Sequence, residues 1–188
     1  LMARPWTRGE GPETVPAKLE GIWALGFGGS DQPGRVYLGT HPGGLFRSDD
    51  GGDSFHLVRG LWDHPTRLKG WFGGGRDTAG IHSILVDPTD SRHLFVGVSC
   101  GGVYESRDDG ETWDPRNKGL NADFLPDPLS EVGQDPHRLA LCPADPRTLW
   151  QQNHCGVYLS RDGAASWQEV GEKDGPVGFG FAVAVDQD

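Results

Sequence analysis

Residues Ser106–Trp113 read SRDDGETW, and this short stretch decides the fold because the chain contains three versions of it. The other two are Ser48–Phe55 (SDDGGDSF) and Ser160–Trp167 (SRDGAASW), and the three begin 58 and 54 residues apart. An Asp carboxylate can accept hydrogen bonds from backbone N–H groups across a tight turn, glycine permits a positive φ, and the final aromatic residue can pack inward. The three stretches are therefore predicted to be structural turns and not a catalytic motif.

The same order of short apolar runs and turn residues surrounds each of these stretches. Short runs separated by Gly, Pro, Asp and Asn are typical of antiparallel strands. We expect first strands at Trp23–Phe27, His82–Val86 and His137–Leu141, second strands at Val36–Thr40, Leu94–Val98 and Leu149–Asn153, third strands at Leu45–Arg47, Val103–Glu105 and Val157–Leu159, and fourth strands that begin at Ser54, Thr112 and Ser166. A four-stranded unit that repeats at about this interval has the size of one propeller blade.

The repeated turn resembles the Asp-box, or bacterial neuraminidase repeat, S-x-D-x-G-x-[ST]-[WF], of β-propeller proteins. The residues taken as this structural motif are Ser48, Asp50, Gly52, Phe55, Ser106, Asp108, Gly110, Trp113, Ser160, Asp162 and Trp167. The third copy has Ala164 where the motif has glycine, so we expect its turn to be distorted.

The longer pattern of Val86–Trp113 is similar to that of several propeller groups: xyloglucan-degrading glycosidases, the sortilin ectodomain and photosystem assembly factors. It is most similar to uncharacterised bacterial proteins labelled as glycosyl hydrolases with this repeat, and to sialidase-like propellers. The resemblance implies a fold, but a fold does not carry a reaction with it.

The expected fold is all-β: a β-propeller of four-stranded antiparallel blades, with about three complete blades and parts of flanking ones from a six- or seven-bladed ring. The blades are expected at residues 22–60, 81–119 and 137–171. Residues 179–186 are expected to be the first strand of a further blade, and residues 1–21 the end and connecting loop of a preceding one. Three blades do not close a ring. The alternatives are a fragment of a longer propeller, one piece of a nicked chain, and a protomer that completes the ring by association.

Composition narrows the function classes. The formal net charge of −10 disfavours nucleic acid and anionic membranes as partners, because both attract clustered Lys and Arg. The sequence has three cysteines, Cys100, Cys142 and Cys155. An odd number without paired spacing indicates reduced thiols and not a disulfide framework. Residues 1–20 have no apolar stretch typical of a signal peptide, and with the cysteines this predicts a cytoplasmic location, although the sequence begins at Leu1.

Two long connections are expected on the face where propellers bind ligands, namely Leu61–Gly80 and Leu120–Pro136. Aromatic and charged side chains gather in the first connection, and histidines stand at corners and at the starts of first strands. The expected ligand-binding residues are His41, Trp62, His64, Arg67, Trp71, Arg76, His82, His137 and His154. They suit a saccharide, or a protein or peptide partner, through ring stacking and Arg contacts. The alternative is a loop packed over its neighbour, with the tryptophans as plugs.

Paired carboxylates on the same face could serve glycoside hydrolysis. The candidates for acid and base are Asp63, Asp77, Asp123, Asp127, Glu131 and Asp135. The alternative is a solvated acidic loop. The histidines could ligate a divalent metal, but no spacing here matches a compact metal motif, so neither a metal nor another cofactor is predicted.

A sialidase would need a tyrosine nucleophile. Tyr37, Tyr104 and Tyr158 all occupy repeating aromatic positions and are expected in the core, which leaves none for catalysis. The sequence therefore favours a ligand- or partner-binding propeller of uncharacterised function. The alternative is a glycoside hydrolase, sialidase-like or of another propeller type, that uses the loop carboxylates.

Overall fold

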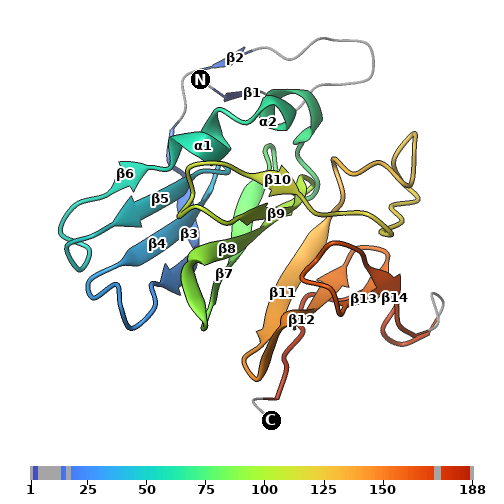
Figure 1. Cartoon of the computed structure of the whole chain (residues 1–188). Helices are drawn as coiled ribbons and strands as arrows, with labels where there is room; N and C mark the ends of the chain where they lie inside the picture. The colour runs from blue at the N-terminus through green and yellow to red at the C-terminus, as the bar shows by residue number, and fades with distance from the viewer. Residues whose placement is uncertain (1, 4–13, 16–17, 172–174, 187–188) are drawn as a thin grey trace.

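The computed structural model describes residues 2–3, 14–15, 18–171 and 175–186 of the chain. It contains three four-stranded antiparallel sheets, each with its strands in chain order. Figure 1 shows these sheets side by side, from β3–β6 in blue and cyan, through β7–β10 in green and yellow, to β11–β14 in orange and red.

Each sheet has one long inner hairpin and a very short outer strand. The first consists of β3 (Gly21–Phe27), β4 (Val36–His41), β5 (Leu45–Ser48) and β6 (His56–Leu57). The second consists of β7 (Gly80–Asp87), β8 (Asp90–Ser99), β9 (Gly102–Ser106) and β10 (Asp114–Pro115). The third consists of β11 (Pro136–Cys142), β12 (Asp145–Asn153), β13 (Gly156–Ser160) and β14 (Gln168–Glu169). The predicted strands are present, and each fourth strand begins two residues later than expected.

The sheets pack face to face with their first strands nearest one another. Strand β3 lies against β7, and β7 lies against β11. Glycine permits the close approach: a Cβ on Gly39 would lie 2.6 Å from the carbonyl oxygen of Ile81. Two apolar cores fill the spaces between consecutive sheets, one around Ile81 and the other around Leu149. This arrangement is that of consecutive propeller blades, so the expected fold class is correct.

The three repeated turns share one hydrogen-bond pattern. In the second turn the Gly110 N–H donates to Ser106 Oγ (2.8 Å), while the Thr112 N–H and hydroxyl donate to the two oxygens of Asp108 (2.9 and 2.5 Å). The first turn makes the same bonds between residues 48 and 54, and the third between residues 160 and 166.

The third turn is not distorted, which corrects the expectation for Ala164. Ala164 takes a φ of 64°, the left-handed conformation that glycine would adopt freely, and its N–H still donates to Ser160 Oγ (2.9 Å). The side chain is fully buried in the core between the second and third sheets, beside Trp167. Packing therefore holds the alanine in the conformation that the turn requires.

The aromatic residues that end the turns behave in two ways. Trp113 and Trp167 are buried, each in the core shared with the preceding sheet. Phe55 is 38% exposed, contrary to the inward packing expected of it. Among the described residues no four-stranded sheet precedes β3–β6, and Phe55 belongs to neither apolar core.

Several segments differ from the expectation. The connection 61–80 contains two short helices, α1 (Arg59–Trp62) and α2 (Pro65–Gly70). Pro65 occupies the first turn of α2, where its missing N–H costs nothing, and the His64 side chain accepts from the Thr66 N–H. Residues 120–135 of the second connection contain neither a helix nor a strand, and β11 begins at Pro136.

The two ends of the chain add little regular structure. Strands β1 (Met2–Ala3) and β2 (Thr14–Val15) pair with each other, and most of the remaining expected 1–21 segment lies outside the described residues. No strand is assigned within residues 179–186, because a strand needs a neighbouring strand with which to form hydrogen bonds. The further blade expected there stays a prediction. None of the described helices has the length and apolar character needed to cross a membrane.

Candidate functional site

The corners between second and third strands lie at the same end of the sheets as the long connections. Backbone hydrogen bonds tie them together: the Gly43 N–H donates to the Ala79 carbonyl (2.8 Å), and the Phe72 N–H to the Cys100 carbonyl (3.2 Å). In the third sheet the His154 N–H donates to the Asp135 carbonyl (2.9 Å). The connections are therefore held over the corners, on the face where a ligand was expected.

A cavity of about 570 Å³ opens on this face, a size typical of small-molecule sites. The cavity is lined by five of the candidate residues identified from the sequence, namely Arg76, His82, Asp135, His137 and His154. It is also lined by residues that were not assigned to a site, among them Trp23, Thr78, Arg138, Phe179 and Phe181. Of these residues, Trp23 could have been identified from the sequence, because in the first copy it replaces the histidine that begins the first strand of the other two copies.

The first-sheet side of the cavity combines an aromatic ring with charged and polar groups. Trp23 is 42% exposed, and the Arg76 guanidinium lies 5.1 Å from the centre of its ring. His41 contacts the edge of the same ring, and its Nε2 lies 3.0 Å from the Thr78 hydroxyl. Its Nδ1 lies 3.2 Å from a carboxylate oxygen of Glu20. Trp23, Arg76, His41 and Glu20 also line a smaller adjoining recess of about 90 Å³.

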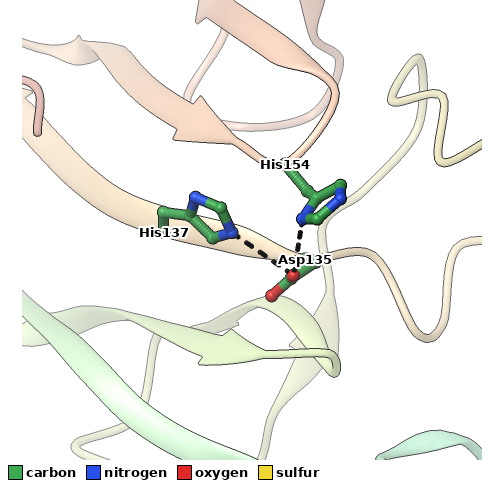
Figure 2. A group of neighbouring side chains, drawn as sticks. All are labelled: Asp135, His137 and His154. Atoms are coloured by element: carbon green, nitrogen blue, oxygen red, sulfur yellow. Dashed lines mark hydrogen bonds and ion pairs between the residues drawn. The ribbon is translucent and has the colours of Figure 1, made fainter. Parts of the chain in front are cut away.

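The third-sheet side holds a cluster of one carboxylate and two imidazoles. Asp135 immediately precedes β11, His137 is the second residue of that strand, and His154 lies at the β12–β13 corner. Figure 2 shows both rings directed toward the Asp135 carboxylate. Asp135 Oδ2 lies 3.3 Å from His137 Nε2 and 3.5 Å from His154 Nδ1.

Hydrogen bonds control the charge of this cluster. Burial would raise the pKa of Asp135, but hydrogen bonds from His137 and from the Cys100 N–H outweigh burial and lower it. Burial would lower the pKa of His137, but the Asp135 carboxylate and the Gly180 carbonyl outweigh it and raise the pKa. Asp135 is therefore ionised at neutral pH and is not placed to act as a general acid.

His82 lies deeper in the same cavity. Burial lowers its pKa to about 4, although the Asp135 carboxylate and the Pro136 carbonyl act in the opposite direction. Its Nδ1 lies 2.9 Å from the Ser83 hydroxyl, and its Nε2 has no hydrogen-bond partner among the described residues. His82 is therefore a neutral imidazole at physiological pH.

Four residues expected to bind a ligand lie in packed parts of the first connection. Trp71 is 7% exposed, and its indole N–H donates to Tyr104 Oη (2.7 Å). Arg67 is buried with its guanidinium 3.9 Å from the ring centre of Trp62, and it donates to the Trp62 carbonyl. His64 caps α2 and contacts the Tyr104 ring. This arrangement matches the alternative of a loop plugged by its tryptophans.

The candidate carboxylates do not come together. Asp63 pairs with Arg59 (2.8 Å), and Asp123 Oδ1 lies 3.4 Å from Cys155 Sγ. Asp127 accepts from the Leu129 N–H (3.1 Å) and lines a separate, mainly apolar cavity of about 750 Å³ between the two long connections. Asp77 and Glu131 line neither cavity. Of the six candidates, Asp135 is the one that lines the 570 Å³ cavity.

The three tyrosines are buried, as expected of core positions. Tyr37 and Tyr104 are fully buried, and Tyr158 is 1% exposed. Burial raises the pKa of all three, that of Tyr158 to about 12. A buried phenol with a raised pKa is a poor nucleophile, so these residues do not provide the tyrosine that a sialidase needs.

Comparison by sequence finds xyloglucanases. The chain is 27% identical over 177 residues to xyloglucanase Xgh74A of Acetivibrio thermocellus, covering 84% of the chain and 19% of the enzyme. It is 31% identical over 161 residues to a xyloglucanase of a Paenibacillus species, and the match covers 73% of this chain and 15% of that enzyme. An oligoxyloglucan-reducing end-specific xyloglucanase of Emericella nidulans is 24% identical over 155 residues, and the match covers 74% of this chain and 18% of that enzyme. The chain thus spans less than a fifth of these relatives. No family model matches.

Comparison by structure finds propellers. An ancestral GH74 enzyme superposes with a TM-score of 0.58 at 18% identity, covering 83% of this chain and 19% of the enzyme. The GH74 enzyme of Niastella koreensis superposes with a TM-score of 0.51 at 19% identity, covering 80% of this chain and 22% of that enzyme. YCF48 from Cyanidioschyzon merolae superposes with a TM-score of 0.50 at 16% identity, covering 83% of this chain and 39% of YCF48. The chain therefore has the β-propeller fold, and in sequence it is similar to propeller glycosidases of the xyloglucanase type.

Proposed function

We propose that this chain is the saccharide-binding part of a glycoside-hydrolase-like β-propeller, with the 570 Å³ cavity as the binding site and xyloglucan oligosaccharides as the first candidate ligands. The proposal rests above all on the half-exposed Trp23 ring beside Arg76, in a cavity that also has polar groups, imidazoles and two further aromatic rings. The similarity to xyloglucanases moves the glycosidase-like alternative ahead of the partner-binding interpretation that the sequence favoured.

The side chains around the cavity suit a sugar. The apolar face of a pyranose ring can pack on the indole of Trp23, since aromatic rings bury a large area at a fixed geometry. Arg76 and Thr78 line the same cavity and supply hydrogen-bond donors for sugar hydroxyls. Phe179 and Phe181, both more than half exposed, add apolar surface on the opposite side.

Binding is a better assignment for this part of the protein than bond cleavage. Glycoside hydrolysis uses two carboxyl groups on either side of the scissile bond, and one of them must be protonated to act as the acid. Among the described residues that line the cavity, Asp135 is the single carboxylate, and its lowered pKa keeps it ionised. The acid, and with it cleavage, is therefore not assigned to this chain.

Calorimetric titration of the intact protein with a xyloglucan oligosaccharide tests the proposal. We expect saturable binding that Trp23→Ala weakens at least tenfold, because the stacking surface is lost. Trp62→Ala is the matched control: Trp62 is also a partly exposed tryptophan, but it does not line the cavity, so its removal should leave the affinity unchanged.

Two results would contradict the proposal. One is the absence of binding to xyloglucan, cello- and mixed-linkage oligosaccharides alike. The other is equal loss of affinity in the Trp23 and Trp62 variants, which would point to general destabilisation. Thermal melts of both variants separate that second case from a local effect on the cavity.

A further inference from the structure

The cluster of Asp135, His137 and His154 has the spacing of metal ligands. Asp135 Oδ2 lies 3.3 Å from His137 Nε2 and 3.5 Å from His154 Nδ1, and the three ligand atoms all lie within 4.8 Å of one another. In a tetrahedral zinc site with bonds of about 2.0–2.1 Å, two ligand atoms stand about 3.3 Å apart. Both distances are also longer than the usual 2.9–3.0 Å of an N–H···O hydrogen bond.

The contacts of His137 orient its ring as a ligating histidine is oriented. His137 Nδ1 lies 2.5 Å from the Gly180 carbonyl oxygen, which can only accept, so Nδ1 carries a proton. In the neutral imidazole Nε2 then presents a lone pair to an ionised oxygen of Asp135. Two lone pairs that face each other need either a second proton on the ring or a metal ion. A hydrogen bond from the opposite ring nitrogen to a carbonyl is also the usual way in which a ligating histidine is oriented.

The carboxylate is oriented in the same manner. Asp135 is 6% exposed, and its Oδ1 accepts from the Cys100 N–H (2.9 Å) and from the Ser99 hydroxyl (3.2 Å). These bonds leave Oδ2 as the oxygen that faces both imidazoles. A buried carboxylate that is fixed through one oxygen and directs the other at two histidine nitrogens is a partly assembled ligand set.

His82 is a separate observation that points to a ligand in this cavity. It is 94% buried, lines the cavity together with the cluster, and its Nε2 has no hydrogen-bond partner among the described residues. A buried polar atom without a partner costs free energy, and a water or an ion held in the cavity would remove that cost. A water or hydroxide in the open position of a bound metal would give His82 Nε2 its missing partner.

From these contacts we infer that Asp135, His137 and His154 bind a divalent first-row transition metal, with Zn²⁺ as the first candidate and a fourth position open to the cavity. Two imidazole nitrogens and one carboxylate oxygen suit Zn²⁺, Fe²⁺, Co²⁺ or Ni²⁺, whereas Ca²⁺ and Mg²⁺ prefer sites made of oxygen alone. The sequence led us to expect no metal, because residues 135, 137 and 154 form no compact motif. The pairing of β11 with β12, in which Pro136 lies opposite Asn153, brings His154 next to Asp135 and His137 although it is distant from them in sequence. The inference is independent of the saccharide proposal.

Titration calorimetry with ZnCl₂ on the EDTA-treated and dialysed intact protein, in a non-chelating buffer at pH 7.5, tests the inference. We expect one ion per chain. His154→Ala and Asp135→Asn should each weaken binding at least tenfold, because each removes one of three ligands. His154 is suitable for substitution since its side chain is 44% exposed at a corner. His56→Ala is the matched control, because that half-exposed imidazole belongs to the first sheet, outside the cluster.

The pH dependence and a spectroscopic probe complete the test. Affinity should fall at least tenfold between pH 7.5 and 5.5, since ligating histidines must lose their ring protons. Co²⁺ in place of Zn²⁺ should give absorption bands that disappear in His154→Ala. If the intact protein takes up no Zn²⁺, His137 keeps its second proton and the inference is wrong. It is also wrong if uptake is the same in both ligand variants as in His56→Ala while all variants stay folded by circular dichroism.

Discussion

Single residues show where the repeat is under strain. Ala164 stands at the turn position that Gly52 and Gly110 occupy in the other copies, and all three have a positive φ. For a residue with a Cβ, the left-handed conformation costs about 1–2 kcal/mol. The third turn bears this cost because its hydrogen bonds and its buried methyl group hold the conformation.

Ala164→Gly should therefore raise the free energy of unfolding by about 1 kcal/mol, measured by urea denaturation. The reciprocal change, Gly110→Ala, should lower it by about 1–2 kcal/mol or more, because the new Cβ would also lie 3.2 Å from Val58 Cγ1. A destabilised Ala164→Gly variant would contradict this account and show that the packing of the methyl group outweighs the relief of the backbone.

His93 predicts a pH dependence of stability. Its Nδ1 lies 2.9 Å from Asp87 Oδ2 and its Nε2 lies 2.7 Å from Glu105 Oε1, so both ring nitrogens face carboxylates. Burial would lower the pKa of His93, but the hydrogen bonds to Glu105 and Asp87 outweigh burial and raise it. A raised pKa in the folded state stabilises the protein fully below the unfolded pKa of about 6.5, and this contribution is lost as the pH rises through the folded pKa.

Urea denaturation of the wild type between pH 6 and 9 should show this loss, and His93→Gln should lack it, because glutamine does not titrate. The difference between the two proteins at each pH isolates His93 from the other histidines. A difference that stays constant from pH 6 to 9 would mean that His93 is not the titrating group.

At the scale of elements, one phenol joins two parts of the connection between the first and second sheets. Tyr104 Oη accepts from the Trp71 indole N–H (2.7 Å) and lies 2.6 Å from the Thr66 hydroxyl on α2. Tyr158, in the equivalent position of the third sheet, makes only long contacts to carbonyls, at 3.3 and 3.4 Å.

Tyr104→Phe leaves the buried indole N–H without its acceptor and should cost about 1–3 kcal/mol of stability. Tyr158→Phe is the matched control and should cost clearly less, since the bonds that it removes are weak. Equal losses of free energy in chemical denaturation would show that the connection is held by burial alone and that the Tyr104 hydroxyl contributes nothing specific.

How far the sequence predicted these elements depends on how local their signals are. The strands carry their own signals, an apolar run bounded by Gly, Pro or Asp, and their ends were placed to within four residues. Nothing local distinguishes Trp71, which is buried on Tyr104, from Trp23, which lines the cavity. The residues of the metal cluster were identified one by one as site candidates. Their mutual contact depends on the pairing of β11 with β12, which no local signal reports.

At the scale of the whole molecule, the first sheet has an apolar face that no described residue covers. Ile22, Leu25 and Phe27 on β3 are 57%, 61% and 68% exposed. In the second and third sheets the first strands pack against a preceding sheet. Burial of three such side chains is worth about 1.5–3 kcal/mol each, enough to favour association.

The 188-residue chain produced alone should therefore associate, with a mass by light scattering above its own 20.3 kDa. Leu25→Asp combined with Phe27→Asp should return the mass to that of one chain, because charges are costly in an apolar contact. A single-chain mass for the unsubstituted protein would contradict the prediction. Completion of a propeller ring by association, one of the alternatives that the sequence left open, depends on this result.

The repeated turns and the cavity lie at opposite ends of the sheets. The antiparallel strand order places each turn between the third and fourth strands, and the corners with His41, Cys100 and His154 at the other end. Selection for a durable scaffold and selection for a new ligand would therefore act on separate sets of residues. Libraries restricted to the corners and the two long connections could change specificity while the turns remain constant, so the fold is well suited to directed evolution.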